Sequence, residues 1–453
     1  RQMCIRDRGN THQGGVNGGQ QEWVAVFCEH VVAHELHSER GCYTADKKFP
    51  GGWKVLGLGR QQADPYQCSE GVAHSGEVYP KPRCYHPAMG EFKIIDRADQ
   101  LADACERLAR SEVIALDTEF MREKTYAPRL CLIQLRGADD PVLLDPLSVE
   151  DLSPLMELLS DSRREVVLHS CRQDLEALAT RTTVSFGSLF DTQVAAAFCG
   201  YGDQISYAAL VEELDGVHLD KAHTRADWSR RPLPPAELHY AADDVRHLHV
   251  LREQLTDQLE STGRMSWFRD ECARLLDPQL WQPDPAESWR RLKGAASLPI
   301  AAQETARQLA IWRETRAIER DRPREWILPT AVLLEISRQA PQSTQTLGAI
   351  EGINSGVQRN SGREILQICR DTTRDPGAET LWRQTELLEP TDRKRVKGIM
   401  RLIREVAEEI GISPSLIANR SAVERFVRDA AEIDLFSGWR RAVVGERVLR
   451  DYS

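Results

Sequence analysis

A regular pattern of apolar and polar residues begins at about Phe92 and continues to the end of the chain. Residues 98–109 have apolar side chains at helical spacing, which predicts a helix. Short apolar runs separated by polar or Gly/Asp-containing links follow, and they predict strands at Val113–Leu116, Leu130–Leu135, Val142–Leu144 and Val166–Leu168. Helices are then predicted at Gln173–Thr180, up to Phe198, and at Ala208–Leu214 and Pro235–Leu259. Strands first and interleaved helices afterwards predict an α/β domain with a mixed sheet over residues 91–277.

The chain is helical in pattern after about Asp277. Several prolines mark a linker over 278–296, and two all-helical segments follow, at 297–377 and 378–453. Each segment starts with a long amphipathic helix, and Pro376-Gly377 separates the two. We therefore predict one α/β domain followed by two all-α domains.

Residues 1–90 lack sustained periodicity. Asn10–Gln21 is rich in Gly, Asn and Gln, Pro50–Pro87 is broken by Gly, Pro and Ser, and the chain starts at Arg1 rather than Met. We expect a poorly specified extension that is either disordered or not native coding sequence. Its cluster of Cys28, His30, His34 and His37 has zinc-like ligands, but neither Cys-x-x-Cys nor His-Glu-x-x-His is present, so we interpret the cluster as fortuitous.

Composition narrows the class of protein without naming a function. At 453 residues and 41% apolar residues, the chain is long enough for several domains with real cores. It has neither an apolar run that could cross a bilayer nor a recognisable signal peptide, and its eleven cysteines have no regular spacing, so we expect reduced thiols and a cytoplasmic location. The net charge of −10 argues against a surface coated with nucleic-acid-binding charge, although a local basic strip remains compatible with it.

Four carboxylates and one tyrosine form the candidate site. Asp117 and Glu119 are two apart on a predicted strand, so both leave the same face, whereas Thr118 points the other way. Tyr240 and Asp244 are four apart on a predicted helix and share one face. Asp243 also shares a face with Tyr240, but we favour Asp244. Asp174 starts the helix that follows an apolar strand, where side chains can converge over a sheet edge.

These residue types together indicate a metal centre. Four acids in one low-dielectric site cannot all stay ionised without a cation, and hard oxygen ligands suit Mg²⁺ or Mn²⁺. Two such ions catalyse phosphodiester hydrolysis. A phenol is too weak a base at neutral pH, so we expect Tyr240 to orient the attacking water. Each of the three sequence blocks alone has an ordinary explanation, as a turn, a helix start or a solvated pair. The occurrence of all three blocks in this order favours a site in which Asp117, Glu119, Asp174 and Asp244 hold two divalent metal ions.

The same blocks resemble the three motifs of the DEDD exonuclease superfamily, in its tyrosine-containing branch. The segments 129–134 and 219–228 are similar to ribonuclease D, and the two helical segments resemble tandem helicase-and-RNase-D C-terminal (HRDC) domains. The resemblance covers about 92–453. It implies a ribonuclease-H-like fold, metal-dependent removal of nucleotides from RNA 3′ ends as nucleoside 5′-monophosphates, and precursor tRNA and other small RNAs with extra 3′ residues as substrates.

Residues that hold the RNA are predicted near the first motif and in a basic loop. Phe120, Met121 and Arg122 are placed to contact the terminal nucleotide. The loop 221–231 offers Lys221, Arg225, Arg230 and Arg231 as phosphate contacts, with Trp228 as a stacking platform or, equally well, as a half-buried Trp. Two basic stripes, Arg313/Arg316/Arg320 and Lys394/Lys397/Arg401/Arg404, could also hold phosphates, but we slightly favour solvated helix faces.

Two other functions stay open on sequence alone. A DNA 3′–5′ exonuclease would use the same carboxylates, although no polymerase domain follows. A catalytically silent RNA-binding adaptor would keep the fold, but an unused acid cluster has no evident structural value. For the favoured enzyme we expect RNA as the partner, a monomer, no membrane and no obligatory protein partner.

Overall fold

The structure, a computed structural model, describes residues 92–219, 226–282, 284–374, 388–429 and 431–452. All of them lie in one compact unit, Pro82–Ser453. The zinc-like cluster at residues 28–37 lies outside the described residues. Among the helices of the described segments, none is long and apolar enough to span a membrane.

A six-stranded sheet organises the first domain, and its strand order is β1-β4-β3-β2-β5-β6. The strands are β1 (Lys93–Ile95), β2 (Val113–Met121), β3 (Arg129–Arg136), β4 (Val142–Leu144), β5 (Glu165–Leu168) and β6 (Ser188–Asp191). The pairs β2–β3 and β3–β4 are antiparallel, and β1–β4, β2–β5 and β5–β6 are parallel. The predicted mixed sheet is thus confirmed, and β1 and β6 extend it at the two edges.

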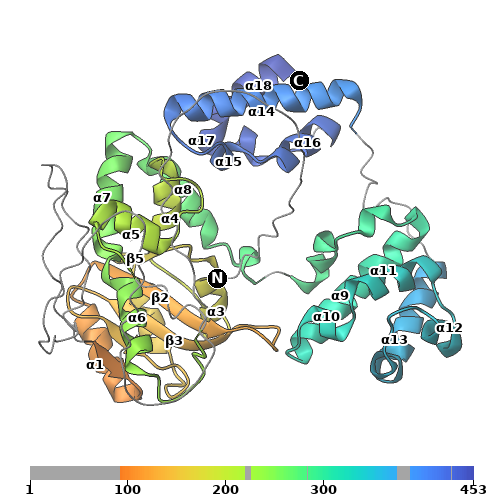
Figure 1. Ribbon diagram of the computed structural model, residues 1–453, viewed down its shortest axis with the longest axis horizontal. Helices are drawn as coiled ribbons and strands as arrows, with labels where there is room; N and C mark the ends of the chain where they lie inside the picture. Colours follow the sequence, from red (N-terminus) through yellow and green to blue (C-terminus); the bar gives the residue numbers. More distant parts are fainter. Residues whose placement is uncertain (1–91, 220–225, 283, 375–387, 430, 453) are drawn as a thin grey trace, which may run out of the picture. The chain divides into compact units, whose positions relative to one another are not determined.

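Eight helices accompany the sheet in the described part of this domain. They are α1 (Ala98–Leu108), α2 (Ser153–Leu159), α3 (Arg172–Leu178), α4 (Thr192–Phe198), α5 (Tyr207–Asp215), α6 (Pro235–Arg246), α7 (Leu248–Ser261) and α8 (Met265–Leu275). Helix α6 lies across β2, β3 and β4 (Figure 1). The predicted single helix 235–259 was wrong in one respect, because it is divided at His247 into α6 and α7.

The central strands are buried on both faces, which explains their near-continuous apolar runs. Ile114, Leu116, Ile133 and Val167 have no exposed surface. Polar residues within these strands are therefore conspicuous: Asp117 and Thr118 are buried in the middle of β2. The sheet thus carries two of the candidate site residues on a central, largely buried strand.

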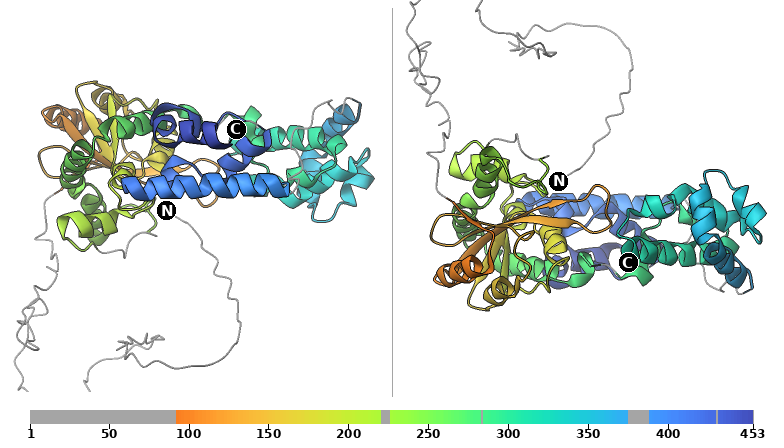
Figure 2. Two further views of the ribbon diagram at one scale, coloured as in Figure 1. Left: turned by 90° about the horizontal axis from the view of Figure 1, so that it is seen from above. Right: turned by 90° about the horizontal axis from the view of Figure 1, so that it is seen from below.

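Helices alone make up the remaining described chain. Short 3₁₀ turns η1 (Pro278–Leu280), η2 (Pro285–Arg291) and η3 (Ala295–Ser297) lead to α9 (Ile300–Glu319), α10 (Arg324–Ile327), α11 (Thr330–Gln339), α12 (Thr344–Gly348) and α13 (Ser355–Arg374). The last described part contains α14 (Pro390–Ile410), α15 (Pro414–Ile417), α16 (Arg420–Asp429), the 3₁₀ turn η4 (Asp434–Phe436), α17 (Gly438–Arg440), the π-helical η5 (Arg441–Gly445) and α18 (Glu446–Tyr452). Figure 2 shows α14 as a long straight helix.

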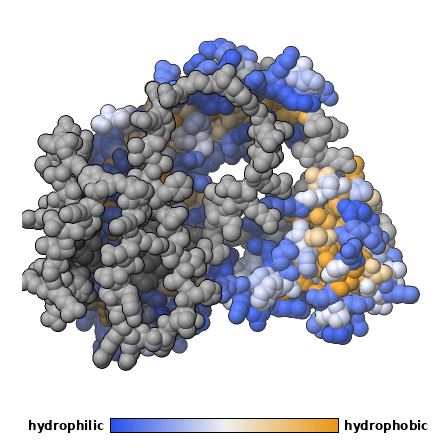
Figure 3. Space-filling model, in the orientation of Figure 1, coloured by the Kyte–Doolittle hydropathy of each residue, from blue (hydrophilic) through white to orange (hydrophobic). Residues whose placement is uncertain are grey.

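The two helical segments differ in how they bury their apolar residues. The first segment has its own core, which includes Leu309, Leu333 and Ile365. The second shares one continuous core with the α/β domain, to which Val396 and Trp439 belong. In the face shown in Figure 3, apolar residues gather over the first segment, while most of the other described surface in view is hydrophilic.

Candidate active site

Three carboxylates from two elements converge beside the sheet. A carboxylate oxygen from each of Asp117, Glu119 and Asp244 lies within 4.8 Å of the other two. Strand β2 supplies the first two from one face by its period of two, and α6 supplies the third. The predicted convergence of these three residues is therefore present in the structure.

A β-bulge follows directly after this pair of acids. The pairing of β2 with β3 shifts between Glu119 and Phe120, because Glu119 pairs with Leu132 while Phe120 pairs with Leu130. A bulge bends the strand and re-aims the side chains beside it, and bulges are over-represented next to active sites. The extra residue is Cys131, so β3 is the bulged strand, and it is bulged opposite the junction between Glu119 and the predicted end-binding residue Phe120 of β2.

Asp174, the fourth predicted ligand, is outside the group of three converging carboxylates found among the described residues. It lies in the first turn of α3 and is buried. The Thr118 hydroxyl donates a hydrogen bond to Asp174 Oδ1 over 2.7 Å. The hydrogen bond from Thr118 therefore joins Asp174 to the strand that carries Asp117 and Glu119. The period of a strand predicts that Thr118 points to the opposite face from these acids, but the sequence pattern contains no signal of its partner.

Asp243, the alternative to Asp244, has a different function. Its carboxylate accepts a hydrogen bond from Arg246 Nε at 2.9 Å. Its backbone carbonyl accepts one from the Tyr207 hydroxyl at 2.9 Å, and the same hydroxyl accepts a bond from the His247 amide at 3.3 Å. The preference for Asp244 over Asp243 thus agrees with the geometry.

Tyr240 is partly buried beside Trp228. Their ring centroids are 6.2 Å apart, and both rings belong to an apolar cluster with Leu132 and Leu143. Trp228 is only 2% exposed, so the predicted stacking platform for a base is wrong for this conformation. The alternative given equal weight, a packed Trp, is what the structure contains. The Trp228 indole packs against residues of α6 and of the sheet.

Arg231 anchors the described end of this loop, residues 226–231. Its guanidinium makes two hydrogen bonds to Asp145, at 2.6 and 2.7 Å, and donates to the carbonyls of Cys131 and Trp228 at 2.6 and 2.8 Å. Arg230 pairs with Glu237. Both arginines, predicted as phosphate contacts, therefore serve within the fold. Lys221 and Arg225 lie outside the described residues.

The end-binding candidates next to the acids have mixed outcomes. Phe120 and Met121 are partly buried against two apolar clusters. Arg122 forms a two-bond ion pair with Glu176 of α3 at 2.7 and 2.8 Å, and it also donates to the Tyr126 carbonyl. Its charge is thus already balanced by a carboxylate, which weakens the prediction that it pairs with the terminal nucleotide.

The two basic stripes also differ. In the first, Arg313 is buried and donates to the Leu328 carbonyl and to Thr330, while Arg316 pairs with Glu319 and Glu364. The favoured interpretation, a solvated helix face, is therefore wrong for the buried Arg313, and the alternative of a phosphate-binding stripe is not supported by the contacts of either arginine. In the second stripe, on α14, all four basic side chains are exposed, and Arg401 lies 3.5 Å from Glu405.

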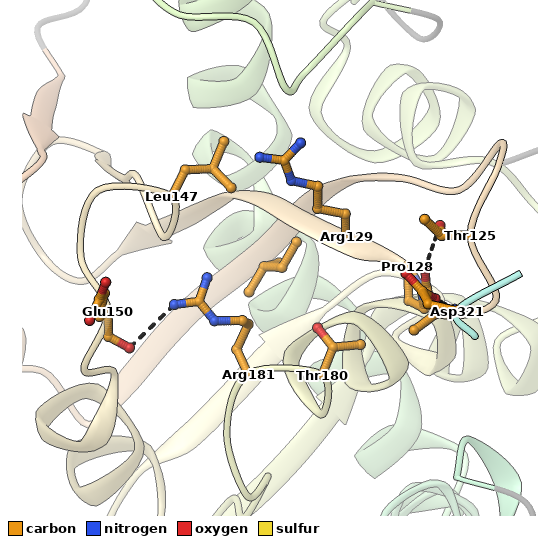
Figure 4. Close-up of a pocket in the computed structure, with 10 residues that line it drawn as sticks. Thr125, Pro128, Arg129, Leu147, Glu150, Thr180, Arg181 and Asp321 are labelled. Carbon is orange, nitrogen blue, oxygen red and sulfur yellow. Dashed lines mark hydrogen bonds between the residues drawn. The ribbon is translucent and has the colours of Figure 1, made fainter. Parts of the chain in front are cut away.

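A cavity of about 660 Å³ lies near the loop that joins β2 to β3. Thr125, Arg129, Thr180, Arg181 and Asp321 are among its lining residues (Figure 4). Arg181 donates to the carbonyls of Pro146 at 2.7 Å and Glu150 at 3.3 Å. None of the candidate metal ligands lines this cavity, so it is separate from the carboxylate group.

The donor set fits hard divalent cations. Three carboxylates within 4.8 Å repel one another strongly unless a cation lies between them. Oxygen-only ligands of this kind select Mg²⁺, Mn²⁺ or Ca²⁺ over softer metals. The three carboxylates therefore fit a hard divalent cation. The group contains neither histidine nor cysteine, which argues against a zinc-type site.

Comparisons with known proteins agree with this site. A protein family described as 3′-5′ exonuclease matches residues 92–260, and the HRDC domain family matches residues 302–369. Ribonuclease D of Granulibacter bethesdensis is 37% identical over 79% of this chain and 91% of its own length. The chain belongs to the ribonuclease D family. Another member, from Acidiphilium cryptum, is 36% identical over 80% of this chain and 94% of its own length.

Solved structures support the same family at the level of the whole described chain. Escherichia coli RNase D, an exoribonuclease involved in structured RNA processing, superposes with a TM-score of 0.73 at 31% identity, covering 80% of this chain and 99% of that one. The catalytic core of RRP6 from Trypanosoma brucei, at 22% identity and a TM-score of 0.51 over 65% of this chain and 83% of that one, shares the fold. The ribonuclease-H-like exonuclease domain and one HRDC domain are thereby established, and we call residues 92–260 the exonuclease domain below.

Proposed function

We propose that this chain removes nucleotides one at a time from the 3′ ends of RNA by metal-dependent hydrolysis, releasing nucleoside 5′-monophosphates. The observation that carries the proposal is the convergence of Asp117, Glu119 and Asp244 within 4.8 Å, and Asp174 is hydrogen-bonded to Thr118 of the same strand as the first two. Precursor tRNAs and other small RNAs with extra 3′ residues are the proposed substrates. Action in the cytoplasm as a monomer, without an obligatory protein partner, belongs to the same proposal.

The proposed roles follow from the chemistry of each side chain. Asp117, Glu119, Asp174 and Asp244 hold two Mg²⁺ or Mn²⁺ ions. When bound, such ions lower the pKa of a water molecule and offset the charge that develops on the leaving 3′ oxygen. The Tyr240 hydroxyl orients the attacking water by a hydrogen bond, because a phenol, with a pKa of about 10, is a poor base at neutral pH. The water adds to phosphorus as the bond to the 3′ oxygen breaks, so the released nucleotide keeps the phosphate at its 5′ position.

The second helical segment is proposed to be a second HRDC domain. Two features support this proposal. It starts with the long helix α14, as the first segment starts with α9, and further helices follow in both. We propose domain limits of 91–277, 297–377 and 378–453, with a linker at 278–296.

Product analysis of a 3′-extended tRNA, with and without EDTA, tests the function. We expect stepwise shortening from the 3′ end, mononucleotide products and complete loss of both with EDTA. Asp117→Asn should abolish hydrolysis, because it removes one of the converging charges, while RNA affinity measured in Ca²⁺ should largely survive. Normal turnover by this variant would reject the assignment.

Matched RNA and DNA oligonucleotides distinguish the proposal from a DNA exonuclease. We expect faster shortening of the RNA strand under identical conditions. A preference for DNA would replace the substrate class while leaving the carboxylate site intact. Binding of RNA without cleavage by the unmodified protein in Mg²⁺ or Mn²⁺ would instead indicate the adaptor.

A further inference from the structure

Two buried polar side chains that take no direct part in the proposed chemistry bond to Asp174 or to the turn that precedes its helix. The first is Thr118, which lies between the two acids of β2 and faces the opposite way. Its hydroxyl donates to Asp174 Oδ1 at 2.7 Å, and both side chains are at most 5% exposed. A hydroxyl that donates to a carboxylate in such a buried place makes a strong, charge-assisted hydrogen bond.

The second is Asp191, at the end of β6. Its carboxylate accepts four backbone N–H bonds: Oδ1 from Ser170 (3.1 Å), Gln193 (2.9 Å) and Val194 (3.2 Å), and Oδ2 from Cys171 (2.8 Å). The bonds from Gln193 and Val194 cap α4. Those from Ser170 and Cys171 fix the turn between β5 and α3, so one carboxylate ties that turn to the neighbouring strand.

The turn is conformationally unusual at one residue. Ser170 has φ of 62°, in the left-handed region that non-glycine residues rarely adopt. Such a backbone costs free energy and persists only where its surroundings determine it. Asp191, which is 2% exposed, supplies that determination by accepting the Ser170 amide. Helix α3 begins two residues later, and Asp174 lies in its first turn.

We propose that Thr118 and Asp191 are positioning residues for Asp174: Asp191 fixes where α3 starts, and Thr118 fixes how the Asp174 carboxylate is turned. This inference rests on the proposed function, in which Asp174 helps to hold a divalent ion. A metal ligand that is free to rotate must be ordered when the ion binds, and partners behind a ligand remove that cost. Strand β2 then contributes the acids Asp117 and Glu119 from one face and the orienting hydroxyl of Thr118 from the other.

Substitutions at Thr118 test the hydroxyl alone. Thr118→Val keeps the shape and removes the hydroxyl, while Thr118→Ser keeps the hydroxyl and removes a methyl group. Thr118→Ala compared with Thr118→Ser forms a second pair that differs only in the hydroxyl. Each pair is compared by Mn²⁺ titration calorimetry without RNA and by kcat and KM on a short RNA. Loss of the hydroxyl should weaken Mn²⁺ binding and lower kcat by about 10- to 100-fold, with little change in KM.

Asp191→Asn tests the turn. An asparagine amide places N–H groups opposite backbone N–H donors, so it cannot accept the bonds on both sides as the carboxylate does. We expect weaker Mn²⁺ binding in the folded protein, with the fold verified by circular dichroism. Mn²⁺ binding by folded Asp191→Asn that equals that of the unmodified protein would reject the positioning role of Asp191, and failure of this variant to fold would show that Asp191 serves the fold as a whole rather than the position of Asp174.

Three outcomes separate this inference from the function on which it rests. If the hydroxyl-lacking variants bind Mn²⁺ and cleave RNA like their hydroxyl-bearing counterparts, the positioning role of Thr118 is rejected. If Asp174→Asn also binds Mn²⁺ and cleaves normally, the proposed function of Asp174 itself is wrong. If Asp174→Asn is inactive while the Thr118 variants are unaffected, the proposed function stands and only the positioning role of Thr118 is overturned.

Discussion

Tyr240 lies one helical turn before Asp244 on α6, and its ring packs against the buried Trp228. This packing fixes the position of the phenol ring. Tyr240→Phe should therefore keep the ring in place and remove the hydroxyl that is proposed to orient the attacking water. We expect single-turnover cleavage to slow by about 10²-fold or more, with RNA affinity nearly unchanged. An unaltered single-turnover rate would remove Tyr240 from the mechanism.

Asp145 shows how one buried ion pair links stability to pH. Burial raises the pKa of Asp145, but its hydrogen bonds and ion pair with Arg231 outweigh that effect, so the net pKa is lowered. A lowered folded-state pKa stabilises the protein above the unfolded-state value of about 3.9, and this contribution is lost as the pH falls towards the folded-state value.

Asp145→Asn should accordingly lower the free energy of unfolding by about 2 kcal/mol near neutral pH. The difference from the unmodified protein should shrink at about pH 3, measured by urea unfolding at both pH values. Asp99→Asn, which removes an exposed ion pair with Arg97, is the matched control and should have no comparable effect. Equal differences for Asp145→Asn at both pH values would contradict the linkage.

The break between α6 and α7 has a specific cause. The Tyr207 hydroxyl donates to the Asp243 carbonyl and accepts from the His247 amide, two groups that an uninterrupted helix would pair with each other. A side chain inserted into the helical hydrogen-bond ladder bends the helix. Burial, followed by the nearby charge of Asp244, raises the pKa of Tyr207 well above its usual range, so the hydroxyl keeps its proton to donate.

Tyr207→Phe should disturb this element and the site together. Without the hydroxyl, two buried backbone groups lose their partner, which should cost about 2 kcal/mol in the free energy of unfolding. Asp244 lies three residues before His247, so kcat should fall more than KM rises. Tyr201→Phe removes a hydroxyl that accepts a bond from Gln258 of α7, outside this ladder, and should leave kcat unchanged. If kcat is equally normal in Tyr207→Phe, the break does not serve the site.

Local spacing rules explain which features could be predicted from sequence. The pairs Asp117/Glu119 and Tyr240/Asp244 each depend on one element's period, and the structure places Asp117, Glu119 and Asp244 together. Burial of Trp228, the partner of Thr118 and the insertion of Tyr207 depend on contacts between residues far apart in the chain. A basic loop or stripe gives the same pattern whether its arginines face RNA or, like Arg231 and Arg313, hold the fold together.

In the whole described chain, the first helical segment contacts the loop between β2 and β3. The Tyr126 hydroxyl donates to Glu314 at 2.5 Å, and Arg324 lies over the Tyr126 ring while pairing with the same glutamate. Burial, and then the hydrogen bond to Glu314, raises the pKa of Tyr126 to about 12. The backbone amides of Tyr126 and Ala127 also donate to Asp321. This segment thus holds the loop that follows the acid-bearing strand.

The second helical segment is attached to α8 through aromatic rings and two ion pairs, of which one joins Arg274 to Asp434. Trp439 stacks on Trp267 of α8 with centroids 5.1 Å apart and meets the Phe198 ring edge-on at 5.3 Å. Its indole N–H donates to Glu271 at 3.1 Å, and Arg440 pairs with the same carboxylate. Because these residues belong to the core shared with the exonuclease domain, we expect the two parts to unfold together.

Trp439→Ala should therefore destabilise the exonuclease domain itself. Loss of a large buried aromatic side chain costs about 4 kcal/mol in the free energy of unfolding. In urea unfolding, the near-UV circular dichroism signal and the nuclease activity should be lost in one transition. This transition should occur at a lower urea concentration than in the unmodified protein. Trp326→Ala is the control, because Trp326 is 57% exposed on α10 and its removal should shift neither signal. If activity in Trp439→Ala survives to the same urea concentration as in the unmodified protein, the shared core does not couple the two parts, and the second segment is then an independently folding appendage.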